Sequence, residues 1–118
     1  MAGTDILAAL TEVLKARRDA DPEASYVAEL YAKGLNRILE KVGEEATETV
    51  LAAKDLDGHG AEASEAARDA LVHEVADLWF HTLVMLVHLK VDPSDVLATL
   101  EGRFGLSGHE EKRSRQTP

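Results

Sequence analysis

The stretch Leu35–Lys54, LNRILEKVGEEATETVLAAK, decides the fold, because its apolar residues recur at the spacing of an α-helix. They form one continuous stripe made of Leu35, Ile38, Leu39, Val42, Ala46, Val50 and Ala53. Glu45 lies at the border of this stripe, whereas Glu44 and Glu48 lie roughly opposite to it. Packing through the stripe alone would therefore leave Glu44 and Glu48 in water.

A second acidic pair, Glu74 and Asp77, stands in another helical pattern that starts between residues 61 and 64 and runs to about residue 90. Residues three positions apart share a helix face, so Glu45 and Glu48 can point one way together, as can Glu74 and Asp77. If the two helices lie side by side, four carboxylates meet and repel one another. A hard divalent cation removes that cost, and Mg²⁺ prefers oxygen ligands. The sequence predicts a Mg²⁺ site, with Mn²⁺ as the alternative, at Glu45, Glu48, Glu74 and Asp77.

The segment Leu78–Leu89 is apolar around nearly the whole helix circumference, apart from a polar line that includes His81 and His88. A helix of this kind is usually buried. A chain of 118 residues can hardly bury it on every side by itself, so we expect a second copy of the chain to cover part of it. The prediction is a homodimer or a higher homo-oligomer.

The rest of the chain also has helical patterns and helix-end signals. Thr4-Asp5 opens an N-terminal helix that reaches about residue 19 within segment 1–20. Asp21-Pro22 indicates the start of a short helix that ends at Gly34, although Ser25 is a competing first cap.

Residues 55–60 are rich in turn formers and predict the connection of a helical hairpin. Asp92-Pro93 opens the last helix, and Gly105 closes it. Residues 106–118 look like a mobile tail. The prediction is one all-α domain over residues 1–118, with four or five helices.

Composition excludes several functional classes. The formal net charge of −9 and the 4% aromatic content argue against a nucleic-acid partner. The absence of cysteine excludes thiol catalysis and thiolate metal sites. The N-terminus does not have the pattern of a signal peptide, and the longest apolar run is too short to span a bilayer, so we expect a cytoplasmic protein without a membrane partner.

Basic residues precede the first acidic cluster at near-helical intervals: Lys33, Arg37 and Lys41. They are either ordinary surface ion pairs or a series of phosphate contacts that leads to the metal. His81 is interpreted as a core or interface histidine that is hydrogen-bonded to the carboxylate of Asp77. By itself, the basic cluster of the tail is a solvated terminus.

Several motifs together resemble a known enzyme family. They are Ser25-Tyr26-Val27, Lys33-Gly34, Lys41-Val42-Gly43-Glu44-Glu45-Ala46-Thr47-Glu48, Glu74-x-x-Asp77-Leu78 with His81, and Ser107-Gly108-His109-Glu110-Glu111-Lys112-Arg113-Ser114-Arg115. This set resembles the phosphoribosyl-ATP pyrophosphohydrolases, which belong to the MazG-like all-α nucleotide pyrophosphohydrolases. The segment before Ser25 lies outside the strong match.

The resemblance implies Mg²⁺-dependent hydrolysis of phosphoribosyl-ATP to phosphoribosyl-AMP and pyrophosphate, the second step of histidine biosynthesis, by a cytoplasmic homodimer whose helices complete a bundle. In that case Glu44 would orient or deprotonate the attacking water. The tail would fold over bound substrate. Contacts with the phosphates are expected from five basic residues: Lys33, Arg37, Lys41, Lys112 and Arg115.

Two alternatives stay open at this stage. One is a house-cleaning hydrolase of non-standard nucleoside triphosphates, which shares the acidic signature. The other is a non-catalytic acidic helical dimer.

Overall fold

The computed structural model describes residues 3–60 and 64–104, and these ranges contain helices and turns but no strand. The elements are α1 (Gly3–Ala16), the short 3-10 helix η1 (Arg17–Asp19), α2 (Tyr26–Lys33), α3 (Leu35–His59), α4 (Glu65–His88) and α5 (Pro93–Glu101). The all-α prediction is confirmed. The predicted mobile tail, residues 106–118, lies outside the described residues.

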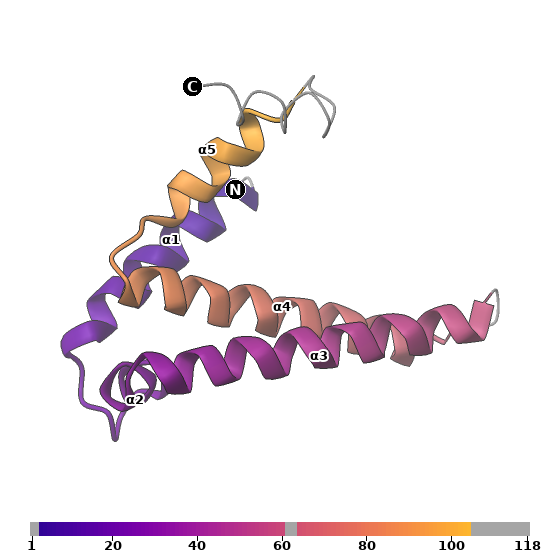
Figure 1. Ribbon diagram of the computed structural model, residues 1–118, viewed down its shortest axis with the longest axis horizontal. Helices are drawn as coiled ribbons and strands as arrows, with labels where there is room; N and C mark the ends of the chain where they lie inside the picture. The colour runs from indigo at the N-terminus through magenta and orange to yellow at the C-terminus, as the bar shows by residue number, and fades with distance from the viewer. Residues whose placement is uncertain (1–2, 61–63, 105–118) are drawn as a thin grey trace.

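Helices α3 and α4 form a long antiparallel hairpin, which is the largest packed unit of the fold (Figure 1). The short helix α2 lies at one end of this hairpin, against the start of α3. Helices α1 and α5 lie beside each other and project from the hairpin at the same end (Figure 1).

The core lies where α1, α2, α3 and α4 meet. Its fully buried side chains come from all four helices: Leu14, Leu30, Ile38, Val84 and Val87. The N-terminal helix therefore belongs to the folded domain, because its Leu14 is 0% exposed.

The predicted start of the short helix at Asp21-Pro22 is wrong, and the competing cap Ser25 is used instead. The Asp21 carboxylate accepts a hydrogen bond from Glu23 N (2.9 Å) within a turn. Ser25 has the extended backbone of a cap, and its hydroxyl accepts from Ala28 N (3.2 Å). Asp21 thus stabilises a turn before the helix, and α2 starts at Tyr26.

The predicted connection at residues 55–60 is also wrong, because α3 continues to His59. Residues that favour turns are tolerated in a helix when the preceding residues already form it and tertiary packing holds it. Leu56 is half-buried in this part of α3. The helix ends at Gly60, whose φ of 56° is in the left-handed region that favours glycine. Ser64 then caps α4 by accepting from Ala67 N (3.1 Å).

Asp92 opens α5 as predicted, but the helix ends at Glu101 rather than near Gly105. The Asp92 carboxylate accepts from Ser94 N (2.9 Å), and this backbone hydrogen bond holds the pKa of Asp92 below its usual value. Its cap is therefore intact above the usual pKa and weakens as the pH falls through the lowered one.

Helix α4 is not buried all round within one chain. Trp79 is 61% exposed and Val72 is 64% exposed. By length and composition alone, Glu65–His88 is the one helix of the described residues that could cross a membrane. It also carries Glu74 and Asp77 and packs along α3. The same length and composition occur in core helices of soluble proteins.

Candidate active site

Three carboxylates of the hairpin converge on one point. Glu45 and Glu48 stand one turn apart on α3, and Glu74 stands on the antiparallel helix α4. One carboxylate oxygen of each lies within 4.8 Å of the other two. Glu45 is only 5% exposed, Glu74 is half-buried, and Glu48 is open to solvent. The cluster therefore has a buried inner side and an accessible outer side.

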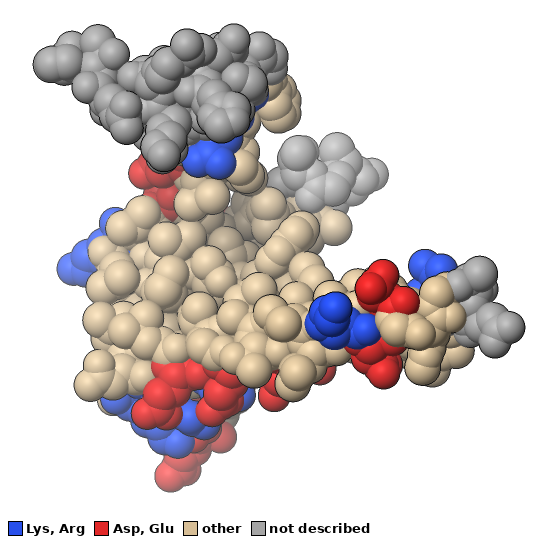
Figure 2. Space-filling view, turned by 45° about the vertical axis from the view of Figure 1, so that its right-hand side comes forward, with Lys and Arg blue, Asp and Glu red and all other residues tan. Residues whose placement is uncertain are grey.

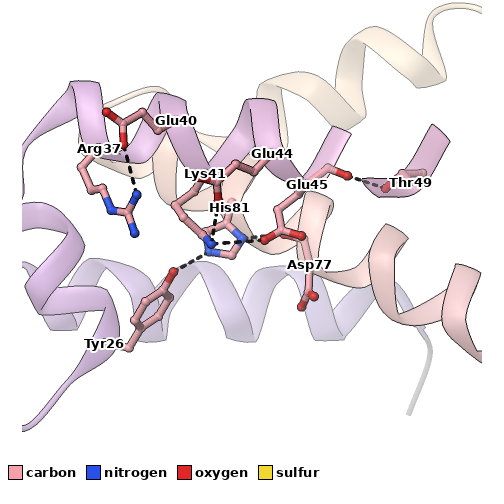
Figure 3. A network of polar contacts seen from close by, with 9 residues as sticks. All are labelled: Tyr26, Arg37, Glu40, Lys41, Glu44, Glu45, Thr49, Asp77 and His81. Atoms are coloured by element: carbon pink, nitrogen blue, oxygen red, sulfur yellow. Dashed lines mark hydrogen bonds and ion pairs between the residues drawn. The ribbon is translucent and has the colours of Figure 1, made fainter. Parts of the chain in front are cut away.

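Asp77, the fourth predicted ligand, lies outside this group of three. It follows Glu74 by nearly one turn of α4 and is exposed in the single chain. Figure 3 draws its side chain on α4, the helix that packs along the helix of Glu45. Its role as a metal ligand stays a prediction.

Two oxygen atoms of the cluster have no partner within the part of the chain that the structure describes. Glu45 Oε2 and Glu74 Oε2 are both buried, and neither accepts a hydrogen bond. A buried carboxylate oxygen without a donor is costly. A divalent cation held by Glu45, Glu48 and Glu74 would compensate the charge of these carboxylates, and the all-oxygen donor set fits Mg²⁺ or Mn²⁺.

Lys41 places an ammonium beside the cluster, one turn before Glu45 on α3 (Figure 3). Its Nζ lies 3.1 Å from Glu44 Oε2 and 3.5 Å from Glu45 Oε1. The hydrogen bond to Glu44 raises the pKa of Lys41, with partial opposition from burial. Glu44 itself is exposed, as expected from its place opposite the apolar stripe.

The other two basic residues expected near the substrate each pair with an acid close by in sequence. Arg37 Nη1 lies 3.1 Å from Glu40 Oε2 on α3. Lys33 Nζ lies 2.7 Å from Glu29 Oε1 on α2, and this contact lowers the pKa of Glu29. Their contacts with phosphate stay a prediction. Lys112 and Arg115 lie outside the described residues.

The structure adds Tyr26 to the surroundings of the site, and it corrects the partner expected for His81. His81 is 6% exposed, and its Nδ1 contacts the main-chain oxygen of Asp77 (2.8 Å), not the carboxylate. A carbonyl oxygen can only accept, so Nδ1 carries the proton. The Tyr26 hydroxyl then donates to Nε2 of His81 (2.9 Å; Figure 3).

Sequence reasoning did not assign Tyr26 a role, because 55 residues separate it from His81. The only signal was its place in the Ser25-Tyr26-Val27 motif. Tyr26 is 49% exposed, and its hydroxyl points toward His81 (Figure 3).

Chemically, the arrangement combines carboxylates that could hold a divalent cation with basic side chains that could contact an anion. The carboxylates stand on two antiparallel helices, and Arg37 and Lys41 stand on successive turns of α3. The fold and site thus define an all-α protein with a candidate metal site of the kind that acts on phosphate compounds.

Comparison with known proteins gives the particular family. The family model described as Phosphoribosyl-ATP pyrophosphohydrolase matches residues 7–104. A relative from Hydrogenovibrio crunogenus (strain DSM 25203 / XCL-2), named Phosphoribosyl-ATP pyrophosphatase, is 58% identical over 111 residues, which cover 94% of this chain and 93% of the relative. The chain belongs to the phosphoribosyl-ATP pyrophosphohydrolase family. The match begins within α1, so it includes most of the segment before Ser25.

Proposed function

We propose that this protein hydrolyses phosphoribosyl-ATP to phosphoribosyl-AMP and pyrophosphate with the help of Mg²⁺, as the second step of histidine biosynthesis in the cytoplasm. Water attacks the anhydride that joins the α- and β-phosphoryl groups, and its oxygen ends on one of the two products. Family membership and the relative's name support the reaction. The observation that carries the site is the convergence of Glu45, Glu48 and Glu74, with two buried oxygens that lack a partner.

The proposed ligands of the cation are Glu45, Glu48 and Glu74, with Asp77 as the fourth. When bound, the cation neutralises charge that develops on the pyrophosphate as it leaves. Glu44, at the exposed edge of the cluster, orients or deprotonates the attacking water. The phosphate oxygens accept hydrogen bonds from basic residues, which are Lys33, Arg37, Lys41, Lys112 and Arg115.

The test is pyrophosphate release from phosphoribosyl-ATP, measured with Mg²⁺ and again after its removal with EDTA. We expect turnover that requires the cation, and a clear preference for phosphoribosyl-ATP over free nucleoside triphosphates. Faster turnover of non-standard triphosphates would favour a house-cleaning hydrolase. No turnover of any nucleotide, together with no rise in the melting temperature at millimolar Mg²⁺, would favour a non-catalytic acidic dimer.

The protein is further proposed to work as a homodimer, because one chain leaves much apolar surface open. The Cα radius of gyration is 17.2 Å, against about 13 Å for a compact chain of about 100 residues. An apolar groove runs between α1, α4 and α5, and its lining includes Trp79, 61% exposed, and Leu100, 47% exposed. Figure 2 shows a broad face with few charged side chains in its middle. A second copy of the chain would cover such a face.

Trp79→Glu should convert this dimer to a monomer. The substitution places a charge on the apolar face, where desolvating it would oppose association. Sedimentation velocity should show the wild type at the dimer mass and the variant at the monomer mass. An unchanged dimer would place the interface on another face, and a monomeric wild type would remove the dimer from the proposal.

A further inference from the structure

In the structure, the positive charge beside the carboxylates is the side-chain ammonium of Lys41. Lys41 Nζ contacts Glu45 Oε1 at 3.5 Å and Glu44 Oε2 at 3.1 Å. The Lys41 side chain is only 19% exposed, and that of Glu45 is 7% exposed. This ion pair is therefore more shielded from water than those of Lys33 or Arg37.

The Lys41–Glu45 ion pair reduces the electrostatic repulsion within the carboxylate cluster. Three carboxylates whose oxygens lie within 4.8 Å of one another repel, most strongly where Glu45 is withdrawn from water. An ammonium at Glu45 offsets part of this repulsion before any metal ion arrives. It leaves Oε2 of the same carboxylate without a partner, so the compensation is incomplete.

Lys41 and a divalent cation would both interact with the carboxylate of Glu45. A dication beside Glu45 repels the Lys41 ammonium, so the two positive charges compete for one buried negative charge. We propose that Lys41 is a built-in counter-ion of the carboxylate cluster. Its ammonium weakens metal binding to the free enzyme and releases its contact with Glu45 when the cation binds. This inference rests on the metal site of the proposed function.

The release of Glu45 has a consequence for the substrate. Lys41 keeps its contact with Glu44 at the exposed edge of the site, where its ammonium becomes available to a phosphate oxygen. Binding of the cation would thus prepare the site for the polyphosphate. By linkage, a polyphosphate held by Lys41 would favour the cation in return.

If Lys41 instead positions a metal ligand, its removal should change the metal affinity in the opposite direction. If its ammonium served only to orient Glu45 toward the metal, removing it would loosen the ligand and weaken binding. The sign of the change in metal affinity therefore separates a competing counter-ion from a positioning clamp.

The experiment is calorimetric titration of the full-length protein with Mg²⁺ or Mn²⁺ alone, without substrate. Lys41→Met should tighten binding by about tenfold, because the competing charge is gone. Lys41→Arg should stay near the wild type, because it keeps a positive charge on the same turn of α3. The matched control is Lys15→Met, which removes an ion-paired lysine of α1 that lies 3.7 Å from Asp92, and it should leave the affinity within about twofold.

Thermal unfolding gives a second readout that shows whether each variant is folded. In EDTA, Lys41→Met should melt below the wild type, since its carboxylates have lost their counter-ion. In saturating Mg²⁺ its melting temperature should rise by more than that of the wild type.

Unchanged or weaker binding in Lys41→Met, while the wild type binds the cation, would overturn this inference and leave the metal site standing. Equal tightening in Lys15→Met would also overturn it, because net charge would then explain the effect. No binding in the wild type or in either variant would overturn both the inference and the metal site.

Discussion

Glu48→Gln should lower kcat/KM for phosphoribosyl-ATP at least about a hundredfold, because the amide keeps the shape of the side chain but removes the charge that is proposed to bind the cation. Glu48 is exposed and brings one oxygen to the cluster with Glu45 and Glu74. Its substitution should therefore leave the helical circular dichroism spectrum unchanged. Steady-state pyrophosphate release, measured over a range of Mg²⁺ concentrations, checks this result.

Asp77→Asn tests the ligand that the single chain leaves outside the group of three. We expect a loss of similar size, since the proposed cation takes its fourth ligand from this side chain. The matched control is Glu40→Gln on α3, whose carboxylate pairs with Arg37 rather than with the cluster, and it should stay within about twofold of the wild type. Full activity in Glu48→Gln would remove the cation site from the mechanism. Full activity in Asp77→Asn alone would restrict the site to three carboxylates.

Leu14→Ala should cost about 2–5 kcal/mol of unfolding free energy, the range for truncating a fully buried leucine. Leu14 is 0% exposed, and it packs from α1 into the core with Leu30, Ile38 and Val84. Since small domains are stable by only about 5–15 kcal/mol, this loss should be visible as a large drop in melting temperature.

Its control is the neighbouring residue Val13, which is 47% exposed, and Val13→Ala should cost much less. Both variants are to be unfolded at one protein concentration, because association would make stability depend on concentration. Equal costs at the two positions would mean that α1 does not close the core.

The helix-end errors have a common physical cause. Asp21-Pro22 and residues 55–60 contain residues that fit a turn and a helix end equally well by local chemistry. The surrounding structure decides between these outcomes. At Asp21-Pro22 the helix start is at Ser25, which has the extended backbone of a cap, and at residues 55–60 the chain continues the long packed helix α3. Local signals gave the correct end where the backbone itself required a particular residue, as at Gly34 with its φ of 95°.

The candidate site shows the same division. Helical spacing predicted that Glu45 shares a face with Glu48 and Glu74 with Asp77, and the packing of α3 on α4 then brings Glu45, Glu48 and Glu74 together. It could not show which oxygens are buried without a partner, nor that Asp77 stays exposed in one chain. Those facts depend on the depth at which α3 and α4 pack.

What the sequence determined by itself is the all-α class, the acidic pairs of two helices and the apolar excess of α4, since each follows from residue type and a period of 3.6. Only the tertiary structure decided that the Lys41–Glu45 ion pair is shielded from water, that Tyr26 donates to His81, and that α1 completes the core. The last two join segments far apart in the chain. The first required knowing which face of α3 is buried, because burial decides whether an ion pair is a solvated surface contact or the counter-ion of a site.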